Sequence, residues 1–187
     1  MGAIYRRQGS GTFVNPPGLQ IRSRLEEIWA YEQLLDDHGY TPSVRVLSLH
    51  TEPAGDADAA ALRVAPGTPL VVMEKLFLED EVPVVLTVNR IPRDRVDHEA
   101  DEHDATVPIF EFLEAHAGAT LSYYLSDLVP IALDGQRAEL LGVEPGTASL
   151  SFEEVGYDAE ARPVAASTSY FRDDLVRFRL MRRRTAS

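Results

Sequence analysis

The chain has 187 residues, 44% of them hydrophobic, and carries 18 Lys or Arg against 30 Asp or Glu, a formal net charge of −12 at pH 7. This acidic balance excludes the body of the chain as a nucleic-acid surface, because phosphate binding requires a positive footprint. The absence of cysteine excludes disulfides, thiolate metal sites and a cysteine nucleophile. With no apolar run of membrane-spanning length and no signal peptide, we expect a cytoplasmic protein with no membrane contact and one main core.

The first informative segment is residues 5–14, where Gly9 and Gly11 bracket a turn and the following Thr-Phe-Val suits a strand. Arg6 and Arg7 precede the turn and can reach phosphates. We therefore predict a basic β-hairpin tip, with a frayed terminal hairpin as the alternative. A linker containing two prolines follows, and then a capping box formed by Ser23 to Glu26 opens a predicted helix that ends near Gly39.

An internal repeat dominates the rest of the chain. Leu-Arg-Val-Ala-Pro-Gly-Thr at 62–68 recurs as Leu-Gly-Val-Glu-Pro-Gly-Thr at 141–147, which places Pro66 and Pro145 79 residues apart. Pro83-Val84 recurs as Pro163-Val164 at a spacing of 80 residues, so the second copy has one inserted residue. Two copies exclude a solenoid and favour one domain with an internal pseudo-twofold duplication.

Both copies predict the same order of elements: a strand, a short helix closed by Pro-Gly, and a hairpin of two strands with an acidic turn. The predicted ranges are 44–52, 56–64, 70–78 and 82–91 in the first copy, and 121–132, 134–143, 149–157 and 162–171 in the second. Helical spacing predicts a further helix at 109–117 between the copies, and alternation predicts a last strand at 176–180. The fold class is α+β, a mainly antiparallel sheet with flanking helices, which leaves clefts for small molecules.

The predicted hairpin resembles the wing of the winged helix-turn-helix in GntR-type bacterial transcription regulators, which commonly reads R-R-Q-G-x-G-T-F-V. The remainder resembles the HutC-type branch of that family, whose effector domain is called UTRA and is similar in fold to chorismate lyase. The residues that carry this resemblance are Gly39-x-Thr41-Pro42, the two Pro-Gly-Thr blocks, Pro83 to Pro92, Ile109-Phe110-x-x-Leu113-Glu114, and Pro163 through Ser167, Tyr170, Arg172 and Asp174.

The resemblance implies three parts: a wing remnant at 1–15, a linker at 16–22 and a UTRA effector-binding domain at 23–184, with most of the winged helix-turn-helix missing. It further implies a homodimeric one-component sensor in which a small effector changes operator affinity. Operator DNA would be bound only by the complete winged helix-turn-helix. The wing residues implied to contact DNA are Arg6, Arg7, Gly9 and Gly11.

The resemblance also implies an effector site. Its residues are Ala30, Tyr31, Lys75, Phe77, Thr87, Phe110, Tyr124, Glu153, Ala165, Ser167 and Phe171. Six of these replace the Ser, Arg, Glu, Tyr, Glu and Tyr that phosphosugar-sensing relatives commonly carry: Ala30, Phe77, Thr87, Phe110, Ala165 and Phe171. Losing these partners would cost a buried phosphate several kcal/mol. We therefore expect a largely apolar or aromatic effector with at most one negative charge, facing Lys75. The alternative is a collapsed aromatic core without a ligand.

Other patterns give weaker signals. His98 and His103 lie in an acidic stretch but are five residues apart, so they would not share a helix face, and a solvated acidic loop is favoured over a metal site. Arginines at 182–184 favour a solubilising tail. No catalytic or cofactor motif is found, so we expect a non-enzyme without a cofactor. Two alternatives remain, a chorismate-lyase-like enzyme and a dimerisation module without ligand.

Overall fold

The structure is a computed structural model that describes residues 4–7, 11–14, 28, 30, 31, 41–172, 175 and 178, with the first two ranges described as backbone only. The predicted linker, most of the helix opened by Ser23, most of the last strand and the C-terminal arginines lie outside the described residues. Within the described part, no helix is long and apolar enough to cross a membrane.

The predicted N-terminal hairpin is present. Its strands β1 (Ile4–Arg7) and β2 (Gly11–Val14) pair antiparallel, with Arg7 opposite Gly11. The geometry agrees with a wing-like hairpin, and its contact with DNA stays a prediction.

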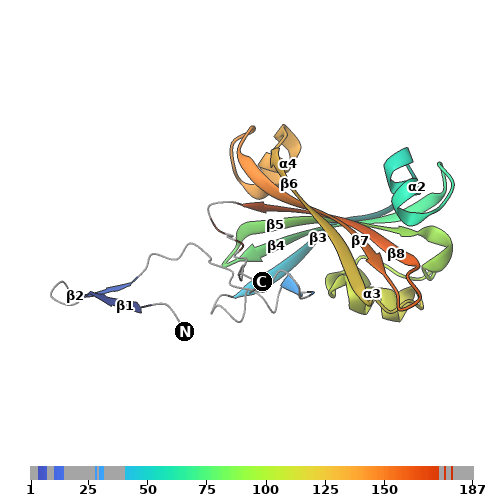
Figure 1. Cartoon of the computed structure of the whole chain (residues 1–187), viewed down its shortest axis with the longest axis horizontal. Coiled ribbons are helices and arrows are strands. Elements are labelled where there is room, and N and C mark those ends of the chain that lie inside the picture. The colour runs from blue at the N-terminus through green and yellow to red at the C-terminus, as the bar shows by residue number, and fades with distance from the viewer. Residues whose placement is uncertain are drawn as a thin grey trace, which may run out of the picture.

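The main body is one six-stranded antiparallel sheet in the order β3-β4-β5-β8-β7-β6. Every predicted strand and helix of the two copies is present, with ends that shift by about two residues at most. The strands are β3 (Pro42–Pro53), β4 (Pro69–Glu79), β5 (Val82–Pro92), β6 (Tyr123–Ala132), β7 (Ala148–Tyr157) and β8 (Pro163–Arg172). The helices are α2 (Asp56–Leu62), α3 (Ile109–His116) and α4 (Gly135–Leu141), with 3-10 turns η1 (Arg93–Arg95) and η2 (Asp104–Thr106). Figure 1 shows α2 and α4 on one side of the sheet and α3 on the other.

The pseudo-twofold axis passes between the two central strands. Val88 of β5 pairs directly with Thr168 of β8, and these residues are 80 positions apart, the spacing of the repeat. The strands of the first copy therefore form one half of the sheet and those of the second copy the other half, as the strand order requires. The turns after both helices carry Gly67 and Gly146 at φ of 81° and 83°, a conformation that favours glycine.

Both short helices end earlier than the Pro-Gly pairs predict. α2 ends at Leu62 because Arg63 adopts a left-handed conformation, and α4 ends in the same way at Leu141, before the left-handed Gly142. In the first copy the Val64 amide then donates to the Ala59 carbonyl at 2.9 Å, which satisfies an end carbonyl of the helix. The proline follows this cap and does not itself end the helix.

The two faces of the sheet differ in chemistry. The face below α2 and α4 is a continuous, mainly aliphatic core; its buried members include Leu62, Leu70, Val72, Leu76, Leu141 and Tyr170. The opposite face holds two separate apolar clusters, one against α3 around Phe112 and one of aromatic rings around Phe171. The space between these clusters is where the candidate site lies.

Candidate functional site

A polar band crosses the sheet between the two apolar clusters. Side chains of a strand alternate between its faces, and on this face β5 contributes Thr87 and Asn89 while β8 contributes Ser167 and Ser169. Thr87 pairs with Ser169 and Asn89 with Ser167, so the four residues surround the pseudo-twofold axis. The two copies thus meet in a quartet of polar side chains.

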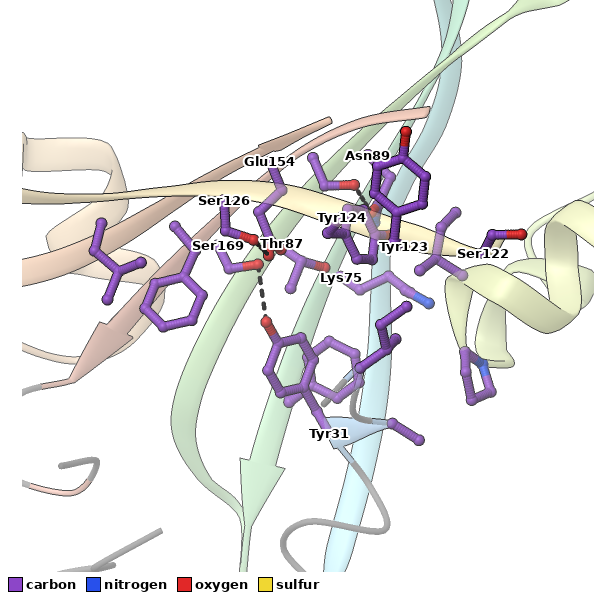
Figure 2. Close-up of a pocket in the computed structure, with 18 residues that line it drawn as sticks. Tyr31, Lys75, Thr87, Asn89, Ser122, Tyr123, Tyr124, Ser126, Glu154 and Ser169 are labelled. Atoms are coloured by element: carbon purple, nitrogen blue, oxygen red, sulfur yellow. Dashed lines mark hydrogen bonds between the residues drawn. The ribbon is translucent and has the colours of Figure 1, made fainter. Parts of the chain in front are cut away.

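A cavity of about 230 Å³ lies over this band and is shown in Figure 2. That volume is below the range of about 300 to 1,000 Å³ that is typical of sites for drug-sized ligands, so it suits a small metabolite. Its lining residues are Ile28, Ala30, Tyr31, Lys75, Phe77, Thr87, Asn89, Pro108, Ile109, Ser122, Tyr123, Tyr124, Ser126, Leu128, Phe152, Glu154, Ser167 and Ser169.

Hydrogen bonds hold most of the quartet in place. The Ser167 hydroxyl donates to Asn89 Oδ1 at 2.9 Å, and the Tyr31 hydroxyl donates to Ser169 Oγ at 3.1 Å. Thr87 is different, because its Oγ1 is buried and has no hydrogen-bond partner among the described residues. An unsatisfied buried hydroxyl costs about 1 to 3 kcal/mol, which a ligand that hydrogen-bonds to it would recover.

Lys75 brings a positive charge to the wall formed by β4. Its side chain is 1% exposed, and its Nζ donates to the Val107 carbonyl at 2.7 Å and lies 5.6 Å from the centroid of the Phe77 ring. Carrying an ammonium group into the interior requires compensating partners. The carbonyl bond directs Nζ toward the end of the cavity next to α3, as Figure 2 shows.

On the opposite wall, β6 and β7 bring together Glu154, Ser126 and Tyr124. Ser126 Oγ donates to Glu154 Oε1 at 2.5 Å. Burial raises the pKa of Glu154, and the bond from Ser126 opposes part of that shift. Burial, followed by the charge of Glu154, also raises the pKa of Tyr124, so its phenol stays protonated at neutral pH. This wall therefore offers hydroxyl groups and a carboxyl group.

The structure brings seven of the eleven predicted effector-site residues to the cavity: Ala30, Tyr31, Lys75, Phe77, Thr87, Tyr124 and Ser167. The other four do not line it. Glu153 points to the other face of β7 because neighbouring strand residues alternate, and Glu154 takes its place. Phe171 packs 4.9 Å from the ring of Phe152.

The last two predicted residues are displaced by packing. Ala165 is fully buried in the apolar cluster beside α3. In α3 itself, the burial of Phe112 and Leu113 fixes the rotation of the helix, so that Ile109 and not Phe110 reaches the cavity. Sequence reasoning also missed Asn89 and Ser169, although alternation from Thr87 and from Ser167 would have pointed to both.

The lining is more polar than the sequence prediction. Six substitutions led us to expect a largely apolar site, but Asn89, Ser126, Ser169 and Glu154 add polar groups at positions outside that comparison. The apolar contribution comes mainly from the two ends of the cavity, where Phe77, Phe152 and Ile109 belong to or adjoin the flanking clusters. The site therefore combines a polar centre with apolar ends.

Comparison with known proteins identifies the family. Residues 37–177 match the UTRA domain. The chain belongs to the UTRA family. Among curated proteins, the HTH-type transcriptional repressor NagR of Bacillus subtilis is 22% identical over 177 residues, covering 95% of this chain and 72% of NagR. An uncharacterized HTH-type transcriptional regulator of Rhizobium meliloti, RB1450, is 28% identical over 179 residues, covering 96% of this chain and 73% of that protein.

Solved structures agree with the fold. PhnF from Mycobacterium smegmatis superposes with a TM-score of 0.81 at 22% identity, covering 98% of this chain and 80% of that chain. The separate effector domain of PhnF gives a TM-score of 0.76 at 21% identity, covering 87% of this chain and all of that chain. The UTRA domain and the α+β, chorismate lyase-like fold predicted from the sequence are confirmed, as is the relationship to GntR-type regulators.

Proposed function

We propose that this UTRA domain binds a small effector in the cavity on the pseudo-twofold axis and thereby changes the affinity of a regulator for its operator. The observation that carries the proposal is the polar centre itself: a cavity built by both copies, with a buried lysine and a Thr87 hydroxyl that has no hydrogen-bond partner among the described residues in its wall. Such groups are expensive in a core that only has to pack.

The domain acts, in this proposal, as a binding module and not as an enzyme. It self-associates as a homodimer, which matches the twofold symmetry of operators read by helix-turn-helix dimers. Operator DNA is bound through a complete winged helix-turn-helix, because the acidic body of the chain repels phosphate. The names of the relatives as transcription regulators support this assignment.

Tyr31 offers a route from the cavity toward the N-terminal part of the chain. Its ring lies 5.0 Å from that of Phe77 and 5.9 Å from that of Phe171, and its hydroxyl bonds to Ser169. It lines the cavity together with Ile28. A ligand that binds more tightly to one position of Tyr31 shifts the chain segment that carries Tyr31 toward that position. Any part of the regulator that this segment holds in place shifts with it.

Native mass spectrometry of the protein purified from its host tests the proposal, with the expectation of one bound small molecule per chain. Extracted ligand should then raise the melting temperature, by the equivalent of about 2.7 kcal/mol at 100 times Kd. Ser167→Leu should fill the cavity and remove this shift, whereas Thr168→Leu, the next residue on the other face of β8, should retain it. A chain that carries no ligand and responds to no extract would overturn the proposal.

A further inference from the structure

Lys75 and Glu154 occupy the same position in the two copies of the repeat. Lys75 lies opposite Thr87 in the β4–β5 pairing, and Glu154 lies opposite Ser167 in the β7–β8 pairing. Thr87 and Ser167 are themselves equivalent, one on each side of the Val88 and Thr168 pair that marks the axis. The pseudo-twofold axis therefore relates a cation on one wall of the cavity to a carboxyl group on the other.

These two residues define the charge of the cavity. Among its described lining residues, Lys75 is the only cation and Glu154 the only carboxyl group. Their strands are separated by β5 and β8, so with strand spacings of about 4.8 Å their backbones are about 14 Å apart. Figure 2 shows the two side chains directed to different parts of the cavity, Lys75 toward α3 and Glu154 toward Ser126.

The carboxyl group of Glu154 lacks a cationic partner among the described residues. Its side-chain donor there is the neutral Ser126 hydroxyl. A carboxylate has about four acceptor sites, and a charge-assisted bond from an ammonium group is roughly twice as strong as a bond between neutral groups. Burial already raises the pKa of Glu154, and a cationic ligand group beside it would favour its ionised form.

The polar quartet fills the space between the two charges. Thr87 Oγ1, with no hydrogen-bond partner among the described residues, lies beside Lys75 in the register of the sheet. A ligand that spans the quartet therefore meets a positive charge, then hydroxyl and amide groups, then a carboxyl group. Neither a simple anion nor an apolar compound uses both ends of this arrangement.

We infer that the effector is a small amphoteric molecule, with a carboxylate or similar anion directed to Lys75 and an amine or comparable N–H donor directed to Glu154. The inference rests on the proposed function, because it assumes that the cavity binds an effector. It names the class of that effector and does not depend on how binding reaches DNA. Ligands that engage one wall alone, such as a simple carboxylate, amine or neutral polyol, are the competing outcomes.

A series of ω-amino acids tests this class, from glycine to 8-aminooctanoate, with the matching alkanoates and alkylamines as single-function controls. Isothermal titration calorimetry on the full chain should show one preferred chain length. The alkanoate and the alkylamine of that length should each bind at least about tenfold more weakly, as expected for the loss of one charge-assisted bond.

Variants assign each end. Lys75→Met should weaken binding of the preferred amino acid by about tenfold and leave binding of the matching amine unchanged. Glu154→Gln should also weaken binding of the amino acid by about tenfold but leave binding of the matching alkanoate unchanged. Glu153→Gln, the neighbour on the other face of β7, is the matched control and should bind as the parent does. Circular dichroism and melting curves verify folding, and Lys75→Gln, which also removes the positive charge, replaces Lys75→Met if the latter does not fold.

Equal binding of alkanoates and amino acids would overturn the inference, as would unchanged affinity in Glu154→Gln. If no member of the series binds, the molecule found by native mass spectrometry decides. A bound molecule with both an anionic group and an N–H donor supports the inference, and one that lacks either overturns it while the proposed function stands. Absence of any bound molecule removes the proposed function itself.

Discussion

In the first copy of the repeat the helix is capped by Arg63 and in the second by Gly142, yet the backbone around the two helices is held by matching hydrogen bonds. The amide of Ala54 donates to Thr68 at 2.8 Å, and that of Leu133 donates to Thr147 at 2.9 Å. Side chains thus differ where the backbone stays the same. The comparison teaches that the backbone contacts, more than individual side chains, preserve the shape of the repeat.

The two short helices and the cavity walls differ in how far the copies have diverged. On the helices, equivalent buried positions carry the same residue type, Ala59 and Ala138, and Leu62 and Leu141. On the cavity face, equivalent positions differ in sign, with Lys75 in one copy and Glu154 in the other. A face that only packs requires matching volume in both copies, whereas an asymmetric ligand requires different groups at the two ends.

The largest expected effect tests whether the packed face is symmetric. Leu62 is 1% exposed and Leu141 is fully buried, and both belong to one cluster. Leu62→Ala and Leu141→Ala should each lower the free energy of unfolding by about 2 to 5 kcal/mol, since both leave a cavity in an aliphatic core. Urea denaturation measures both. A difference of more than about 2 kcal/mol between them would show that one copy dominates the stability of the domain.

The fold was predictable from the sequence because the repeat doubled the signal for each element. The alternation in 44–52 and 121–132, and the Pro-Gly turns ahead of 70–78 and 149–157, predict the strands of each copy from the sequence alone. The ends of the short helices were less predictable. They depend on left-handed caps, and one of these is the arginine Arg63, which by its type does not predict such a conformation.

The site was only partly predictable, because lining a cavity depends on strand register and on helix rotation. Glu153 and Glu154 are adjacent and chemically identical, so composition alone does not show which one faces the cavity. The pairing of Glu154 with Ser167 decides it. The family resemblance places Phe110 and Phe171 at the site, but α3 is rotated so that Phe112 is buried, and Phe171 completes a cluster of rings.

The acidic turns of the two copies should respond to pH in opposite directions. In the first copy, partial burial and then Asp80 raise the pKa of Glu79 from 4.5 to about 7. Its folded state binds a proton more tightly than its unfolded state, so stability falls as the pH rises from about 4.5 to 7. For a fully buried carboxyl this pKa shift would lower the free energy of unfolding by roughly 3 kcal/mol. Glu79 is partly exposed, so solvent screening reduces the loss to about 1 kcal/mol.

Glu79→Gln should therefore stabilise the domain by about 1 kcal/mol above pH 7 and have little effect below pH 4.5.

In the second copy, Asp158 accepts hydrogen bonds from the Arg162 amide at 2.9 Å and the Arg162 Nε at 2.7 Å, which lower the pKa of Asp158. Asp158→Asn should destabilise the domain at neutral pH, with the difference vanishing as the pH falls through the pKa of the folded state. Melting temperatures from pH 3 to 8 measure both, and parallel profiles would contradict the assignment.

The helix caps offer a smaller test. Arg63 has φ of 54°, a left-handed conformation that costs an L residue about 1 to 2 kcal/mol, while Gly142 occupies the equivalent position without that cost. The guanidinium of Arg63 bonds to the Ala161 carbonyl at 3.2 Å, which offsets part of the cost. Arg63→Gly should raise the free energy of unfolding by about 0.5 kcal/mol and Gly142→Arg should lower it by about 1 kcal/mol. A loss of stability in Arg63→Gly would show that the arginine contacts outweigh the conformational strain.

The smallest expected effect lies at the other end of the same helices. Asp134 caps α4 by accepting a hydrogen bond from the Arg137 amide at 2.9 Å, whereas Gly55 at the start of α2 has no side chain to do so. Gly55 is extended, with φ of −71° and ψ of 170°, and an added Cβ would meet no atom within 4 Å. Gly55→Ser should therefore stabilise the domain by a few tenths of a kcal/mol, the usual difference between a serine and a glycine cap.

Gly55→Asp should stabilise the domain less than Gly55→Ser, because Asp56 and Asp58 already place two negative charges in the first turn of α2. The difference should shrink in high salt, where charge repulsion is screened but the hydrogen bond is retained. If aspartate stabilises more than serine at low salt, attraction to the helix dipole exceeds the repulsion between carboxylates, and the two copies follow the same capping rule despite their different charges.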